Sequence, residues 1–375
     1  MNPELYSFAA RLRGLIASWP SLIGHRQFSE LALELFSLQF KHNTVYRKIC
    51  EARKLTPQVV DHWTQIPAVP ARVFKDLELT SLAPEERTTV FHSSGTTEQK
   101  PGRHFHCAES LALYETSLWT WFERRALDAG REVLGLVILT PPPAQVPHSS
   151  LVHMFETVRR RLVGGARVPA SRPEFLGNLD ATGAWTLDFD AALAALSPTA
   201  SRPAPRARLL LGTAFSFVHL LDYLVDRDLR IALPGGSRVM ETGGYKNRSR
   251  MMPKAELHAL ITERLGVPRE NIICEYGMSE LSSQAYDAEI CPPSPILHPR
   301  GFRFPPWARV QIISPESGRE VPEGEAGLLR ILDLANVFSV AAIQTEDLGI
   351  RRGEGFELVG RAQLAEPRGC SLMNA

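Results

Sequence analysis

The sequence predicts an α/β protein with two α/β lobes and a small C-terminal β-rich subdomain. A helical pattern at residues 106–125, a buried strand at 133–140 and a second helical pattern at 150–162 follow one another. Such alternation favours a largely parallel sheet covered by helices. A second alternating run begins after a proline-rich connection at 197–208. From residue 309 onward, short strands separated by turn residues indicate an antiparallel or barrel-like cap.

The individual elements follow from the same patterns. Residues 5–42 carry apolar positions at helical spacing and predict two helices broken near Trp19-Pro20, because proline ends a helical pattern. In the second α/β run we expect strands at 209–215, 238–241 and 271–275 and helices at 217–225 and 254–265. In the cap we expect strands at 310–313, 327–332, 337–342, 348–351 and 356–359.

Composition excludes several classes of protein. The 42 basic and 41 acidic residues nearly cancel, so nothing in the charge indicates nucleic acid as a partner. The longest apolar run, at 133–139, is far shorter than the roughly 20 residues that cross a bilayer, so we expect no membrane insertion. Arg11 and Arg13 interrupt any signal-peptide core. The five cysteines are scattered without a Cys-x-x-Cys pair, which favours reduced thiols in the cytoplasm and argues against a zinc site.

Residues 91–106 are the most informative stretch, because small hydroxyl and glycine residues followed by basic ones suit a bound phosphate. Glycine lets the backbone approach an anion, hydroxyl and amide groups donate hydrogen bonds, and the basic side chains supply positive charge. The residues concerned are Ser93, Ser94, Gly95, Thr96, Thr97, Lys100, Gly102, Arg103 and His104. The stretch lacks the Lys-Ser or Lys-Thr of the common phosphate loop. It predicts a nucleoside triphosphate site; the alternative is a polar surface turn.

A second loop, at residues 240–250, combines a glycine pair with three cations. Its residues Gly243, Gly244, Lys246, Arg248 and Arg250 suit a loop that wraps adenine and reaches phosphates. The alternative for a basic loop of this kind is a solvated surface segment.

Two more segments follow predicted strands, where open α/β sheets place ligand-binding residues. In 274–280, Glu280 is a candidate magnesium ligand and Tyr276 a candidate stacking partner for a nucleobase, with Gly277 and Ser279 between them. In 344–347, Asp347 suits a pair of ribose hydroxyls. A solvated carboxylate and a turn-forming aspartate are the respective alternatives.

The order of these motifs resembles the adenylate-forming superfamily of acyl- and aryl-CoA synthetases, luciferases and peptide-synthetase adenylation domains. The resemblance implies an adenylate-forming core that uses ATP and magnesium, with the first motif holding the triphosphate. It further implies that Glu280 helps to bind magnesium, that Asp347 binds ribose, and that Arg361 lies at a hinge and contacts the nucleotide.

A narrower resemblance is to LuxE-type acyl-protein synthetases, the fatty-acid-activating subunits of bacterial fatty acid reductase complexes. It runs from about residue 70 to the C-terminus and rests on the segments 147–151, 211–215, 241–250, 275–284 and 368–372. Since only residues 362–375 follow Arg361, we expect the large mobile C-terminal domain of the superfamily, which carries a catalytic lysine, to be lacking. Lys246, Arg248, Arg250 or a partner protein would then supply the missing charge.

The resemblance also implies a two-step reaction. A fatty or related carboxylic acid is activated by ATP as an acyl-adenylate, and Cys370, near the C-terminus, then receives the acyl group as a thioester for a reductase or carrier protein. Arg368 nearby favours the thiolate. One alternative is an acyl- or aryl-CoA or carrier-protein ligase that does not use Cys370. Another is a nucleotide- or acyl-adenylate-binding protein with little turnover, because Glu98 places a carboxylate where the family usually has glycine.

These assignments divide the chain into three expected units. Residues 1–200 form an N-terminal α/β lobe with the phosphate-binding loop. Residues 201–295 form a second α/β lobe with the adenine- and magnesium-binding loops. Residues 296–375 form the β-rich cap and the tail that carries Cys370.

Overall fold

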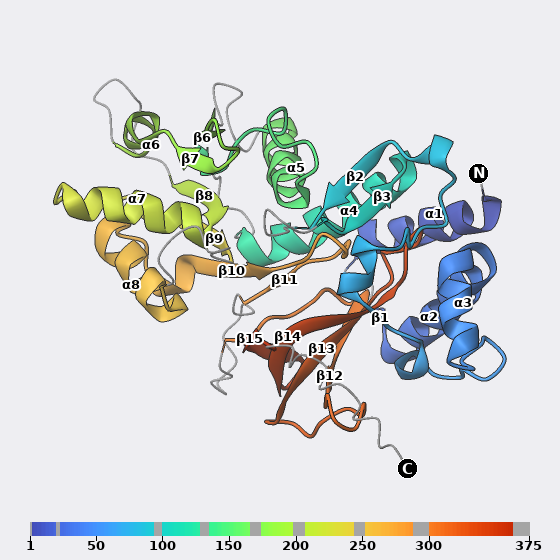
Figure 1. Cartoon of the computed structure of the whole chain (residues 1–375). Coiled ribbons are helices and arrows are strands. Elements are labelled where there is room, and N and C mark those ends of the chain that lie inside the picture. The colour runs from blue at the N-terminus through green and yellow to red at the C-terminus, as the bar shows by residue number, and fades with distance from the viewer. Residues whose placement is uncertain are drawn as a thin grey trace, which may run out of the picture.

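The computed structural model of the chain describes residues 2–19, 23–93, 100–127, 135–165, 174–197, 207–243, 252–287 and 300–362. Within these ranges it is an α/β protein, as the sequence predicts, with one mainly parallel and one mainly antiparallel sheet. Figure 1 shows the helices α5 to α8 gathered around one sheet and the N-terminal helices beside the other. Among the helices of these ranges, none combines the length and apolar character that crossing a bilayer requires.

Three N-terminal helices form the scaffold beside the antiparallel sheet: α1 (Pro3–Ala17), α2 (His25–His42) and α3 (Thr44–Ala52). The first two confirm the predicted pair and its break. Asn2 caps α1 by accepting a hydrogen bond from the Glu4 backbone, and Asn43 caps α3 by accepting one from Tyr46. The sequence patterns did not predict α3, which follows α2 after the single residue Asn43, the C-cap of α2 and the N-cap of α3.

The central sheet has the strand order β11-β10-β9-β8-β4-β5 and is parallel except for β11. Its strands are β4 (Gly135–Ile138), β5 (Glu174–Phe175), β8 (Arg208–Thr213), β9 (Arg238–Thr242), β10 (Ile272–Tyr276) and β11 (Ala285–Tyr286). The helices of this region are α4 (Ala108–Ala126), α5 (Ser150–Gly164), α6 (Phe189–Leu196), α7 (Ala214–Asp226) and α8 (Lys254–Leu265). The predicted helices and the largely parallel sheet are therefore confirmed, whereas α6 and the edge strand β5 were not predicted.

The division into units at residues 200 and 295 stays a proposal. The pairing of β4 with β8 runs across the first of these boundaries. Any lobes separated there would share one hydrogen-bonded sheet. The proline-rich connection lies mostly outside the described residues.

The second sheet confirms the antiparallel cap. It consists of β1 (Val69–Pro70), β12 (Ala308–Ile313), β13 (Ala326–Asp333), β14 (Ala342–Arg352) and β15 (Gly355–Arg361), with only β1 parallel to its neighbour β14. The predicted strand at 337–342 is wrong, because residues 334–341 connect β13 to β14 without strand pairing. The reason is that the Gln39 side chain of α2 donates to the carbonyls of Asn336 and Val337 and accepts from the Ala341 backbone.

Two hairpins complete the fold, and the sequence analysis predicted neither. The strands β2 (Thr89–His92) and β3 (Arg103–His106) frame the hydroxyl-rich loop, and β6 (Gly177–Leu179) pairs with β7 (Trp185–Leu187). The described residues also include the short 3-10 helices η1 (Trp63–Gln65), η2 (Ala71–Lys75), η3 (Pro84–Glu86) and η4 (Arg269–Asn271).

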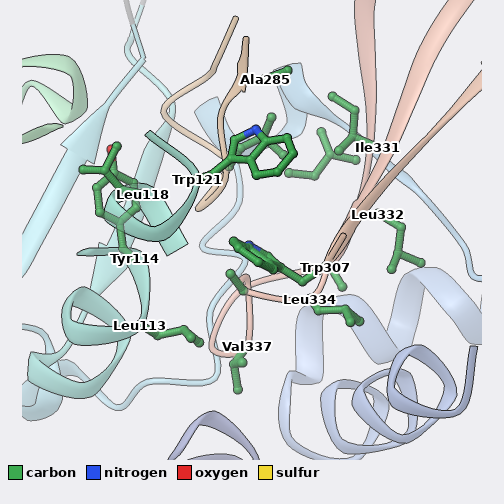
Figure 2. Close-up of a cluster of buried hydrophobic side chains, with 14 of the residues drawn as sticks. Leu113, Tyr114, Leu118, Trp121, Ala285, Trp307, Ile331, Leu332, Leu334 and Val337 are labelled. Carbon is green, nitrogen blue, oxygen red and sulfur yellow. The ribbon is translucent and has the colours of Figure 1, made fainter. Parts of the chain in front are cut away.

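A cluster of large side chains joins α4 to the C-terminal sheet. Trp121 of α4 packs edge-on against Trp307, with ring centroids 6.5 Å apart. Figure 2 shows both indoles among leucine and valine side chains that come from α4 and from residues 331–337. Trp307 is fully buried, and its indole N–H donates to the Ser117 hydroxyl at 2.7 Å. This cluster therefore fixes the cap against the helices that cover the central sheet.

Replacing Trp307 with alanine is expected to destabilise the protein strongly, because it leaves a cavity and removes a buried hydrogen bond. The expected loss in the free energy of unfolding is about 3–5 kcal/mol. Trp119→Ala, which truncates a half-buried indole on the same helix, is the matched control and should cost less than half as much. Urea unfolding measures both; equal losses would contradict the role given to Trp307.

Candidate functional site

One residue pair, Ser93 and Gly102, joins the two ends of the hydroxyl-rich loop where it leaves β2 and enters β3. The Ser93 backbone donates to the carbonyl of Gly102 at 3.0 Å, and the Gly102 backbone donates to the Ser93 hydroxyl at 2.8 Å. Between them, Ser94, Gly95, Thr96, Thr97 and Glu98 lie outside the described residues. Their part in phosphate binding stays a prediction.

Gly102 is the point at which the hairpin meets Glu280. A Cβ atom on Gly102 would lie 2.9 Å from the Ser93 hydroxyl oxygen and 3.2 Å from Glu280 Oε1. The first distance is shorter than Cβ contacts allow, so glycine is needed for this approach. The structure thus brings the base of the hydroxyl-rich loop and the candidate magnesium ligand, 178 positions apart in the chain, to one place.

Ser279 holds the segment before Glu280 onto the hairpin. Its hydroxyl donates to the carbonyl of His92 at 2.9 Å, and its own carbonyl accepts from His104 Nδ1 at 2.8 Å. Burial lowers the pKa of His104 to about 4, so the imidazole is neutral at pH 7 and Nδ1 carries the proton. A nucleotide-binding role of Ser279 stays a prediction.

Glu280 is a buried carboxylate with cations in its surroundings. Only 5% of the residue is exposed, and burial raises the pKa of its carboxyl to about 7. Arg361 and Lys75 act in the opposite direction, because their positive charge favours the ionised form, whereas Asp347 disfavours it. Lys75 was not predicted, because a single cation in η2 before the hairpin is a weak sequence signal.

The residues around Glu280 fit a magnesium ion that is shared with a ligand. Among the residues that the structure describes, no group of three or more His, Cys, Asp or Glu side chains could hold a metal alone. Mg²⁺ is commonly bound by one or two carboxylates plus phosphate oxygens, and Glu280 beside the hairpin offers one such carboxylate.

Tyr276, Asp347 and Arg361, all predicted nucleotide-binding residues, lie together. The Tyr276 hydroxyl donates to Asp347 Oδ2 at 2.9 Å, and Arg361 Nε lies 3.9 Å from Asp347 Oδ1. Burial raises the pKa of Asp347, while the Tyr276 hydrogen bond and Arg361 lower it. The Tyr276 ring also contacts three phenylalanine rings, Phe302, Phe304 and Phe356, at centroid distances of 5.5 to 6.2 Å.

Gly277 makes room for a second buried carboxylate. A Cβ on Gly277 would collide with Glu275 Oε1. Burial raises the pKa of Glu275 to about 7, a hydrogen bond with Thr242 lowers it, and the nearby Glu241 raises it further. The sequence signal for Glu275 was a carboxylate at the end of an apolar strand, inside the segment 274–280, where only Tyr276, Gly277, Ser279 and Glu280 were given roles.

The remaining predicted residues divide into two groups. Arg103 forms an ion pair with Glu78 at 3.0 Å, Lys100 is exposed, and a Cβ on Gly243 would meet open space. The residues predicted to bind or neutralise phosphates and to carry the acyl group that lie outside the described residues are Gly244, Lys246, Arg248, Arg250 and Cys370. Their roles stay predictions.

Comparison with known protein families identifies the family to which the chain belongs. A family model described as Acyl-protein synthetase, LuxE, matches residues 24–102 and 182–375. The chain belongs to this family. Two curated relatives are similar over 92% of this chain: the long-chain-fatty-acid–luciferin-component ligases of Aliivibrio fischeri, 24% identical over 372 residues, and of Vibrio harveyi, 23% identical over 361 residues. The match covers 87% and 86% of those proteins. The predicted family and the predicted enzyme class, a carboxylate-activating ligase, are confirmed.

Solved structures with a similar fold are adenylate-forming ligases. A 2-hydroxyisobutyryl-CoA ligase in an open conformation with 2-HIB-AMP and CoA matches 90% of this chain and 69% of its own, with a TM-score of 0.62 and 13% identity. The chain spans about half (49%) of the ATP-bound MatB of Rhodopseudomonas palustris, at a TM-score of 0.46 and 16% identity. The first of these likenesses confirms the predicted adenylate-forming fold.

Glu275→Gln is expected to stabilise the protein in a pH-dependent way. Because the folded-state pKa of Glu275 lies near 7 and the unfolded value is 4.5, folding binds the proton, and stability falls as the pH rises through this window. The neutral amide avoids that loss, by up to about 3 kcal/mol at pH 8 and almost nothing at pH 4. The exposed Glu316→Gln is the control. Chemical unfolding at both pH values tests this; an equal effect at both would contradict it.

Proposed function

We propose that this enzyme uses ATP and magnesium to activate a fatty acid as an acyl-adenylate and then transfers the acyl group to Cys370. The observation that carries the proposal is the approach of Glu280 to the base of the hydroxyl-rich loop at Gly102. Family membership supports the acyl-protein synthetase activity, and the names of both curated relatives support a long-chain fatty acid as the substrate.

In the first step, a carboxylate oxygen attacks the α-phosphorus of ATP. A P–O bond forms to the acyl group, the P–O bond to the β-phosphate breaks, and pyrophosphate leaves. The hydroxyl and amide donors of residues 93–97 would hold the triphosphate, with Lys100 and Arg103 at the end of the same loop. Asp347 would bind the ribose, and Tyr276 and Arg361, which already contact Asp347, would position it. No side-chain base is required in this step.

Charge neutralisation is the main requirement, because a carboxylate and a triphosphate repel each other. Magnesium held by Glu280 would supply positive charge at the phosphate oxygens. Lys75 and Arg361 are the cations that act on Glu280 within the described part of the chain. We assign the same task to Lys246 and Arg248 of the glycine-rich basic segment 240–250.

In the second step, the Cys370 thiolate attacks the acyl carbonyl carbon. The carbon–sulfur bond forms, the bond between the carbonyl carbon and the AMP oxygen breaks, and AMP leaves. The thioester then passes to a partner, for which a reductase or a carrier protein has the right chemistry. The scattered cysteines agree with a reducing compartment, and we place the enzyme in the cytoplasm.

Glu280→Gln is expected to lower carboxylate-dependent ATP–pyrophosphate exchange about 100-fold at low magnesium, because it removes the anionic ligand. Raising the magnesium concentration should restore part of the rate. Glu115→Gln is the matched control, since that partly buried carboxylate of α4 pairs with His153 and Arg160. A normal magnesium dependence in Glu280→Gln would contradict the assigned role.

Cys370→Ser is expected to keep ATP–pyrophosphate exchange and lose self-acylation, because only the second step needs the thiol. Intact-mass analysis after incubation with ATP, magnesium and mixed fatty acids should show a hydroxylamine-labile adduct in the unmodified protein and in Cys291→Ser, but not in Cys370→Ser.

Two other outcomes would replace the proposal. Unchanged transfer to coenzyme A by Cys370→Ser, with no adduct on the unmodified protein, would indicate an acyl-CoA ligase. An absence of exchange across a panel of acids would indicate a nucleotide-binding protein, as Glu98 in the first motif would favour.

A further inference from the structure

The backbone that carries Glu280 is held by a buried asparagine from a connection of the C-terminal sheet. Asn336, in the connection between β13 and β14, donates from Nδ2 to the carbonyl of Glu280 at 2.8 Å. Its Oδ1 accepts from the Ser282 hydroxyl at 2.6 Å. Asn336 is 2% exposed, so water cannot replace these bonds.

Asp333, at the end of β13, holds the next residues of the same segment. Its carboxylate accepts from the Ser282 backbone at 2.9 Å and from the Ser283 hydroxyl at 2.8 Å, and also from the Ala335 backbone at 3.0 Å. The network continues through Ser283 to Ser117 of α4 at 3.0 Å. Residues 280–283 are therefore tied to the cap and to α4 by side chains that are themselves buried.

Ser279 ties the other end of this segment to the hairpin through His92 and His104. Glu280 thus lies between two sets of hydrogen bonds: those of Ser279 to the β2–β3 hairpin, and those of residues 280–283 to the cap. These hydrogen bonds fix the backbone on both sides of Glu280. That backbone sets the place from which the Glu280 carboxylate reaches the Gly102 end of the hairpin.

We propose that Asn336 is a positioning residue that aims the Glu280 carboxylate at the hairpin and thereby sets the affinity for a divalent cation with ATP. The inference rests on the proposed function. A residue of the cap would then affect phosphate binding at the hydroxyl-rich loop, although the connection between β13 and β14 carries no phosphate-binding motif. Ser282 acts with Asn336, since its hydroxyl fixes the orientation of the amide.

Gln39 provides a control for a merely structural role. Its side chain is 1% exposed and makes three bonds to the same connection, to the carbonyls of Asn336 and Val337 and to the Ala341 backbone. None of these bonds reaches residues 279–283. Gln39→Ala should therefore destabilise the fold as Asn336→Ala does, without moving Glu280.

The experiment measures the binding of Mn²⁺ with ATP to the full chain by electron paramagnetic resonance, next to thermal unfolding. Asn336→Ala should raise the dissociation constant of the cation about 10-fold, as loss of a group that orients a metal ligand commonly does. Ser282→Ala should raise it less, and Gln39→Ala should change it less than twofold despite a similar fall in melting temperature.

Unchanged cation affinity in Asn336→Ala, or an equal loss in Gln39→Ala, would overturn the inference. If Asn336→Ala does not fold, Ser282→Ala decides the question, because it removes one hydrogen bond and keeps the Ser282 backbone bond to Asp333. Failure of the proposed function is a separate outcome: the unmodified protein would then bind Mn²⁺ and ATP without catalysing pyrophosphate exchange.

Discussion

Burial of the Glu280 carboxylate is the constraint on which the candidate site depends. Ionisation of a carboxyl with 5% exposure costs free energy, and the pKa of about 7 expresses that cost. A cation shared with phosphate oxygens would compensate for it in the bound state. The fold must therefore hold the Glu280 carboxyl in a buried position in which its ionised form is disfavoured. The hydrogen bond from the Ser279 hydroxyl to the His92 carbonyl and that from Asn336 to the Glu280 carbonyl serve this purpose.

The segment 276–284 is consequently the point where the separate parts of the fold meet. It leaves the central sheet at β10, touches the hairpin through Ser279 and reaches the C-terminal sheet through Asn336 and Asp333. Tyr276 adds a bond to Asp347 of β14. The tryptophan cluster packs α4 against the C-terminal sheet (Figure 2), and Ser117 links Trp307 to Ser283 of the same segment. The contacts of segment 276–284 and α4 with the C-terminal sheet therefore both stabilise the fold and position the site residues.

Most elements followed from local patterns. The apolar patterns of 254–265 and of 271–275 predicted α8 and β10 within a residue or two, since each signal is contained in a few neighbouring residues. The strand expected at 337–342 was wrong because its backbone groups pair with the Gln39 side chain, about 300 residues earlier in the chain. The short elements η2, β2 and β3 were not predicted for another reason: they have five, four and four residues, too few for a clear apolar period.

By itself, the sequence determined the α/β class, the family and the motif residues Glu280, Asp347 and Arg361, because residue types in a fixed order carry that information. Only the tertiary structure decided that Glu280 meets Gly102, that Tyr276 bonds to Asp347, and that Asn336 and Lys75 belong to the surroundings of the site. Orientation, burial and the resulting pKa depend on contacts between residues distant in the chain. Those contacts exist only once the two sheets pack together.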